Sequence, residues 1–119
     1  VRLWDASTGV ELKCFTGHTN NVTSVDMSLD CSIIVSGSYD ETVRLWNVTS
    51  GEFCLIEAHN RAVKEVCFSA NERSIFSGSN DKTVKMWNVS SGELVQSFEG
   101  QGGYVYSVCV TSDGKWMIS

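Results

Sequence analysis

A histidine, a serine and an aspartate recur together twice in this sequence. The two sets are His18, Ser36 and Asp40, and then His59, Ser77 and Asp81. In hydrolases these residue types form a catalytic triad, in which serine attacks, histidine takes the proton and aspartate orients the imidazole. The residue types alone therefore permit nucleophilic chemistry.

Two observations favour a structural network over a catalytic one. Catalysis needs a single site, whereas the set recurs in register, and no Gly-x-Ser-x-Gly elbow surrounds either serine. Trp46 and Trp87 follow the two sets at the same distance. A buried indole N–H needs an acceptor, and a serine hydroxyl accepts from tryptophan while it donates to histidine. Aspartate then fixes the imidazole tautomer through the other ring nitrogen.

The elements that position these residues repeat along the chain. Trp4, Trp46 and Trp87 end similar segments (Val-Arg-Leu-Trp twice and Val-Lys-Met-Trp once) and lie 42 and 41 residues apart. A Ser/Thr-rich turn ending in glycine follows each tryptophan. A period of 40–45 residues with these marks is typical of a propeller array.

Short β-branched and aromatic segments, separated by Ser, Asp, Asn and Gly, predict strands and turns, and no stretch has a helical period. We expect first strands at residues 22–27, 63–68 and 105–110, and second strands at 33–35, 74–76 and 116–118. We expect third strands at 1–4, 43–46 and 84–87, and fourth strands at 12–15, 53–56 and 94–98. The fold class predicted is all-β.

On these motifs the sequence resembles the WD-repeat (WD40) β-propeller family, over essentially the whole chain. The resemblance implies about three blades' worth of four-stranded antiparallel sheets from a larger ring, most often seven-bladed. It also implies that the recurring polar residues are structural tetrads, which tie the loop before the first strand to the second and third strands. The two tetrads would be His18, Ser36, Asp40 and Trp46, and His59, Ser77, Asp81 and Trp87.

The register of the repeats divides the chain into four units. Residues 1–16 would be the second half of a blade, 17–57 and 58–99 whole blades, and 100–119 the first half of a blade. We therefore expect an incomplete piece of a propeller. Half-blades cannot cover their own apolar faces, so residues 1–119 alone would be poorly soluble or would associate head to tail.

The third copy departs from the pattern because Gln101 stands in the histidine position, followed by Gly102 and Gly103. Two interpretations stay open: ordinary degeneracy of one blade, or a specialised binding loop.

Composition narrows the function classes. The chain has 119 residues, a net charge of −5 and no apolar run near the ~20 residues of a membrane helix. Its basic residues are too sparse for a nucleic-acid groove. Five cysteines, an odd number at irregular spacing without a CxxC pair, favour a reducing compartment, hence an intracellular protein, cytoplasmic or nuclear. Structural zinc would need clustered ligands, so we expect no metal, and we expect no cofactor either.

The resemblance implies a non-catalytic scaffold that binds other proteins or peptides. The binding face would carry Thr19, Asn21, Tyr39, Asn60, Arg61, Asn80, Gly102 and Tyr104. An alternative is the regulatory or sensor propeller of a multidomain enzyme, such as an assembly ATPase, a kinase or a ubiquitin ligase. A peptidase or esterase would need a non-repeating nucleophile, and none is visible.

Overall fold

Every residue from 1 to 119 is described by the structure, a computed structural model, which contains twelve strands and no helix. Accordingly, no helix is present that is long and apolar enough to cross a membrane. The strands of the first half are β1 (Arg2–Trp4), β2 (Glu11–Cys14), β3 (Val22–Met27), β4 (Ile33–Ser38), β5 (Val43–Asn47) and β6 (Phe53–Ile56). Those of the second half are β7 (Val63–Phe68), β8 (Ser74–Ser79), β9 (Val84–Asn88), β10 (Leu94–Phe98), β11 (Cys109–Val110) and β12 (Met117–Ile118).

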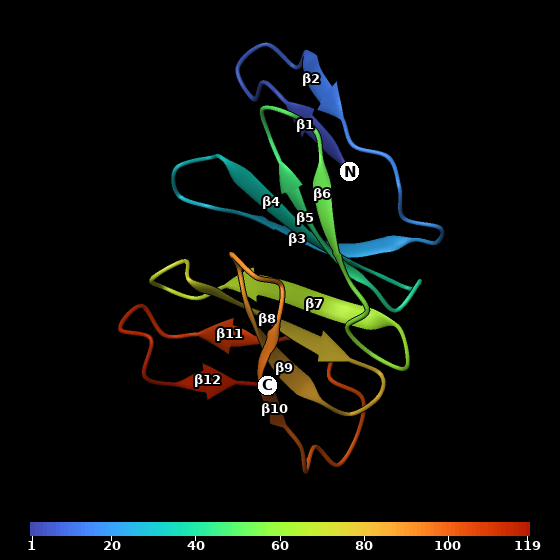
Figure 1. Ribbon diagram of the computed structural model, residues 1–119, viewed down its shortest axis with the longest axis vertical. Coiled ribbons are helices and arrows are strands. Elements are labelled where there is room, and N and C mark those ends of the chain that lie inside the picture. Colours follow the sequence, from blue (N-terminus) through green and yellow to red (C-terminus); the bar gives the residue numbers. More distant parts are fainter.

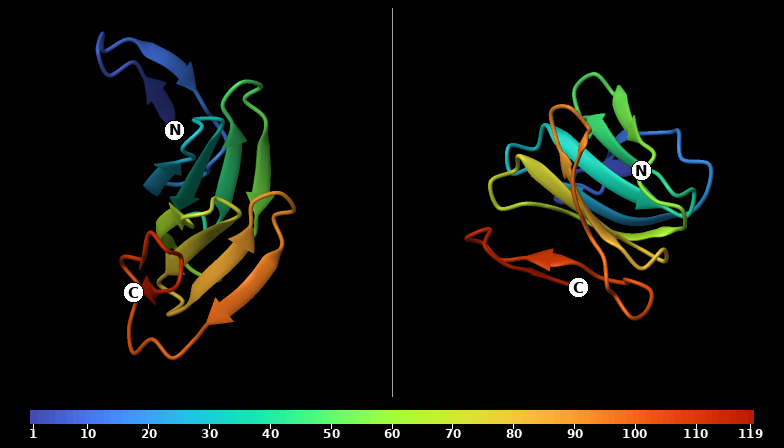
Figure 2. Two further views of the ribbon diagram at one scale, coloured as in Figure 1. Left: turned by 90° about the vertical axis from the view of Figure 1, so that its left-hand side faces the viewer. Right: turned by 60° about the horizontal axis from the view of Figure 1, so that its bottom comes forward.

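The strands form four separate antiparallel sheets in the order of the sequence. Two are four-stranded meanders, β3–β6 and β7–β10, and the others are the pairs β1–β2 and β11–β12. Figure 1 shows the four sheets following one another from the blue N-terminal pair to the red C-terminal pair, and the two views of Figure 2 show that they make an open array rather than a closed ring. The all-β prediction and the blade pattern are confirmed.

Equivalent strands pair in the same register in both whole sheets. Ile34 lies opposite Trp46, and Ile75 lies opposite Trp87. Consequently each tryptophan reaches across its sheet toward the serine two residues further along the neighbouring strand. The repeat in the sequence thus becomes a repeat in geometry.

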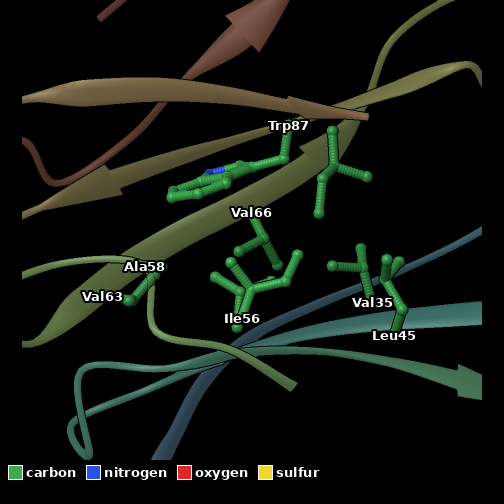
Figure 3. Close-up of a cluster of buried hydrophobic side chains, with 9 residues drawn as sticks. Val35, Leu45, Ile56, Ala58, Val63, Val66 and Trp87 are labelled. Atoms are coloured by element: carbon green, nitrogen blue, oxygen red, sulfur yellow. The ribbon is translucent and has the colours of Figure 1, made fainter. Parts of the chain in front are cut away.

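Apolar side chains fill the space between successive sheets. The main cluster joins β3–β6 to β7–β10, and its members are Val35, Val43, Leu45, Ile56, Ala58, Val63, Val66, Ile75 and Trp87. In Figure 3, Val35 and Leu45 of one sheet face Val66 and Trp87 of the next. Smaller clusters join the N-terminal pair and the C-terminal segment to their neighbours. Each sheet therefore buries its apolar face only against the next one.

Close approach between sheets depends on two glycines in equivalent positions. A Cβ on Gly37 would lie 2.7 Å from Cγ1 of Val63, and one on Gly78 would lie 2.7 Å from Cγ1 of Val105. Real Cβ atoms do not approach other carbons that closely, so Val63 of β7 and Val105, in the segment before β11, pack directly on glycine. The Ser-Gly-Ser segment is thus also an inter-sheet contact.

The two junctions that β7–β10 makes with its neighbours differ in polar contacts. At the first, Thr23 Oγ1 donates to Val63 O (2.7 Å), Ser24 bonds the Glu65 carboxylate, and Asp26 Oδ2 accepts from Phe68 N (2.8 Å). No side-chain hydrogen bond joins the β7–β10 sheet to residues 100–119; a backbone bond from Val105 N to Ser79 O (3.0 Å) does. The first junction is the more firmly tied.

The third copy of the first strand is shorter than expected. Residues 105–110 were predicted as a strand by analogy with 22–27 and 63–68, but only Cys109–Val110 pairs. Its partner is likewise limited to Met117–Ile118, without Trp116. This pair has no third strand beside it, so fewer ladder bonds hold it extended.

Candidate functional site

Hydrogen bonds bring together all four residues of the first predicted tetrad. His18 Nδ1 lies 2.8 Å from Asp40 Oδ2, and His18 Nε2 lies 2.7 Å from Ser36 Oγ. Trp46 Nε1 donates to the same serine oxygen at 2.8 Å. A carboxylate only accepts, so Nδ1 carries the imidazole proton and Nε2 accepts from the serine hydroxyl.

The second set repeats the arrangement with the same distances. His59 lies 2.8 Å from Asp81 and 2.7 Å from Ser77, and Trp87 donates to Ser77 at 2.8 Å. In each set a threonine two residues after the aspartate, Thr42 or Thr83, donates to the other carboxylate oxygen. Each set ties the loop before the first strand to the second and third strands.

Burial governs the charge state of these groups. It lowers the pKa of His18 and His59 below the ordinary value, although the aspartate beside each imidazole offsets part of this effect. For Asp40 and Asp81, burial alone would raise the pKa. Hydrogen bonds from threonine, histidine and backbone N–H groups outweigh it and leave the pKa of both carboxyls lowered. Near neutral pH each pair is a neutral imidazole beside a carboxylate.

Neither serine is placed to attack a substrate. Ser36 and Ser77 have 0% exposed surface, and the oxygen of each is shared between an indole N–H and an imidazole. A nucleophile must reach a substrate carbonyl beside free oxyanion donors. The triad distances are thus present in a place that no substrate enters.

The third copy forms no such set in this chain. The Gln101 side chain, in residues 100–119, makes no hydrogen bond. In the other incomplete unit, residues 1–16, the Trp4 indole is half exposed and makes none either. Elsewhere, no group of three or more His, Cys, Asp or Glu side chains is arranged to hold a metal ion.

The predicted binding-face residues gather at one end of the sheets. Backbone bonds join the loop before each first strand to the turn after the second strand: Tyr39 N to Asn21 O (2.9 Å), and Asn80 N to Ala62 O (3.0 Å). Seven of the eight residues are exposed and Asn80 is half-buried; the exposed ones are Thr19, Asn21, Tyr39, Asn60, Arg61, Gly102 and Tyr104. Since β3 and β7 run side by side in the same direction, these loops share one end of the array.

Two residues that the sequence analysis did not single out, Lys64 and Tyr106, also lie at this end of the sheets. Lys64 Nζ donates to Tyr39 Oη at 2.7 Å and lies 4.3 Å from the centre of that ring. The same ammonium lies 5.8 Å from the centre of the Tyr106 ring, which meets Tyr104 edge to face at 6.3 Å. Lys64 and Tyr106 occupy the repeat position of Thr23, so the register places them beside the predicted loops, whereas their contact with each other follows only from the structure.

The largest groove lies at the opposite end of the array. It measures about 400 Å³ and is lined by Ser69, Ala70, Phe76, Met86 and Asp113, among others. It contains neither histidine nor cysteine, and its only titratable side chain is a carboxylate. The groove is an open space between the β7–β10 sheet and the C-terminal segment.

Comparison with known proteins agrees with the geometry. The sequence pattern of the family described as "WD domain, G-beta repeat" matches residues 9–47, 52–88 and 92–119. The chain belongs to the WD40 family. Each matched region begins with the last strand of one sheet and continues into the next sheet, so the sequence repeat and the blade are offset.

Two curated relatives are similar to parts of this chain. WD repeat-containing protein 18 of Bos taurus is 56% identical over 43 residues, which is 36% of this chain and 10% of the relative. Eukaryotic translation initiation factor 3 subunit I of Aspergillus niger is 40% identical over 64 residues, 54% of this chain and 19% of the relative. The matches thus span between a tenth and a fifth of the relatives' own length.

Proposed function

We propose that this chain is part of a non-catalytic scaffold that binds other proteins or peptides through the loop end of its sheets. The observation that carries this proposal is the exposed set of loop residues, held side by side by the backbone bonds between loops and turns. Tyrosine and arginine, which contribute most to protein interfaces, are both present there. Membership of the WD40 family supports an interaction role in general.

In this proposal the two buried tetrads have a structural role and are not catalytic sites. Each holds the loop before a first strand in a fixed place relative to the neighbouring turn. The loops carry the candidate contact residues, among them Thr19, whose N–H donates to Asp40 Oδ2 at 3.0 Å, and Asn60, which makes the equivalent contact to Asp81. Preorganised loops lose less conformational entropy when a partner binds.

We assign the four units of the sequence, residues 1–16, 17–57, 58–99 and 100–119, to the four sheets in turn. An intracellular location accompanies this assignment. Five free cysteines support it, four of them exposed, because such thiols persist in reducing compartments. A relative named as a translation initiation factor subunit supports it as well.

Affinity capture with the full-length protein that carries these repeats tests the face. One variant combines Tyr39→Ala, Arg61→Ala and Tyr104→Ala. A matched control alters three exposed residues at the opposite end: Leu29→Ala, Arg73→Ala and Trp116→Ala. Quantitative mass spectrometry should show partners lost from the first variant only. Equal loss from both variants, or loss from the control alone, would overturn the proposal.

A further inference from the structure

Lys64 is a cation whose ammonium contacts only tyrosine side chains and which, unlike the buried Arg44, is partly open to solvent. Its ammonium lies over the rings of Tyr39 and Tyr106 and donates to Tyr39 Oη. The chain has 14 acidic and 9 basic residues, yet no carboxylate lies within 4.0 Å of this ammonium. The one ion pair between side chains is that of Arg2 with Glu11, because the imidazoles beside Asp40 and Asp81 are neutral near pH 7. Lys64 therefore has a charge that the chain leaves unpaired.

The hydroxyl of Tyr39 is a hydrogen-bond donor without an acceptor. Because Tyr39 Oη accepts from Lys64, its own O–H is free, and that hydroxyl makes no other hydrogen bond. Two donors, an ammonium and a phenol, thus stand 2.7 Å apart on a half-exposed surface. A carboxylate has two acceptor oxygens and no donor, so one carboxylate can accept from both groups at once.

The surroundings favour a carboxylate that belongs to a peptide. Tyr104 and Tyr106 form an exposed aromatic wall beside the two donors. Two further exposed cations, Arg61 and Lys82, lie at the same end of the β7–β10 sheet: Arg61 O accepts from Ser79 Oγ, and Lys82 N donates to Ser79 O. Aromatic rings supply contact area for neighbouring side chains and cost little conformational entropy.

From this geometry we infer that Tyr39, Lys64, Tyr104 and Tyr106 form an acidic-peptide site, in which Lys64 and Tyr39 bind one Asp or Glu carboxylate of the partner. The inference rests on the proposed binding face and names the chemistry of its ligand. Tyr104 and Tyr106 contact the residues that flank the acidic one.

Phage display of random dodecapeptides on the full-length protein tests the site. Selected peptides should share an acidic residue at one position, and Lys64→Glu should select peptides without it. The best peptide, synthesised and measured by fluorescence polarisation, should bind Lys64→Gln about tenfold more weakly, since a hydrogen bond to a charged group has this weight. Tyr39→Phe, which removes only the hydroxyl, should weaken binding severalfold. Lys115→Gln is the matched control, an exposed lysine at the opposite end that should bind normally.

The outcomes separate the two proposals. Replacing the acidic residue of the peptide with its amide should cost at least as much as Lys64→Gln, because it also weakens the bond from Tyr39. Lys64→Gln should then weaken binding of the amide peptide much less than binding of the acidic one. If affinity is insensitive to Lys64→Gln but falls in the Tyr39/Arg61/Tyr104 triple variant, the acidic site is wrong and the binding face stands. If the triple variant also binds normally, or no peptide is selected, both proposals fail.

Discussion

Replacing Ser77 with alanine should destabilise the protein by about 2–4 kcal/mol. The serine hydroxyl is fully buried and makes two hydrogen bonds, from Trp87 Nε1 (2.8 Å) and to His59 Nε2 (2.7 Å). Alanine is nearly isosteric, so the change creates no large cavity. It leaves one buried donor and one buried acceptor without partners, at about 1–3 kcal/mol each. Coupling between the two keeps the total below their maximal sum.

Urea unfolding of the full-length protein, followed by circular dichroism, measures this loss. Ser112→Ala, an exposed serine without hydrogen bonds, should change stability by less than about 0.5 kcal/mol. In a Trp87→Phe background, Ser77→Ala should cost about 1 kcal/mol less, because the indole donor has already gone. A loss below about 0.5 kcal/mol in the single variant would refute the structural role. Loss of an esterase activity at unchanged stability would restore the triad interpretation.

Three further outcomes follow from buried contacts. Gly37→Ala should cost about 1–3 kcal/mol in urea unfolding, because its Cβ would collide with the next sheet, while Gly103→Ala, with open space around it, should cost little. Arg44 is buried, and its Nε and Nη1 atoms have no hydrogen-bond partner, so Arg44→Met should keep or raise the melting temperature. The equivalent change Lys85→Met should lower the melting temperature, because Lys85 donates to a backbone carbonyl. Stability should fall as the pH drops below about 6.5. Burial holds the pKa of His59 below its value in the unfolded chain, so the unfolded chain takes up the proton first. His59→Gln should make this loss of stability smaller between pH 7 and 5.

Much of the fold could be predicted because its determinants are local and repeated. Alternating apolar residues bounded by polar turns set the strands, and the constant distance from His18 to Trp46 reflects one geometry used twice. The exposure of the loop residues followed from the same register. These features need only the sequence of one repeat and its neighbour.

Residue environments created by distant loops were not predictable in this way. Arg44 and Lys85 are equivalent in sequence, but only Lys85 finds a backbone acceptor, at Ala58. Above Arg44 the loop has Gly17, where a Cβ would lie 2.0 Å from Nη1, so the guanidinium fills space that alanine would occupy. It stacks on Phe53, 4.4 Å from the ring centre. Likewise, the contacts of Lys64 come from Tyr39, in the turn after β4, and from Tyr106, in the segment before β11.

The unequal junctions of the array give the acidic-peptide site one fixed and one adaptable half. Lys64 lies on β7 and Tyr39 in the turn after β4, and hydrogen bonds from Thr23, Ser24 and Asp26 fix these two sheets to each other. Tyr106 lies across the junction where Lys64, Glu65 and Cys67 replace those residues and supply no such bonds. The aromatic wall can therefore shift to fit flanking side chains of different size, while the pair of donors that reads the carboxylate keeps its spacing. Such a surface would select for an acidic residue at one position of the peptide and accept different residues on either side of it.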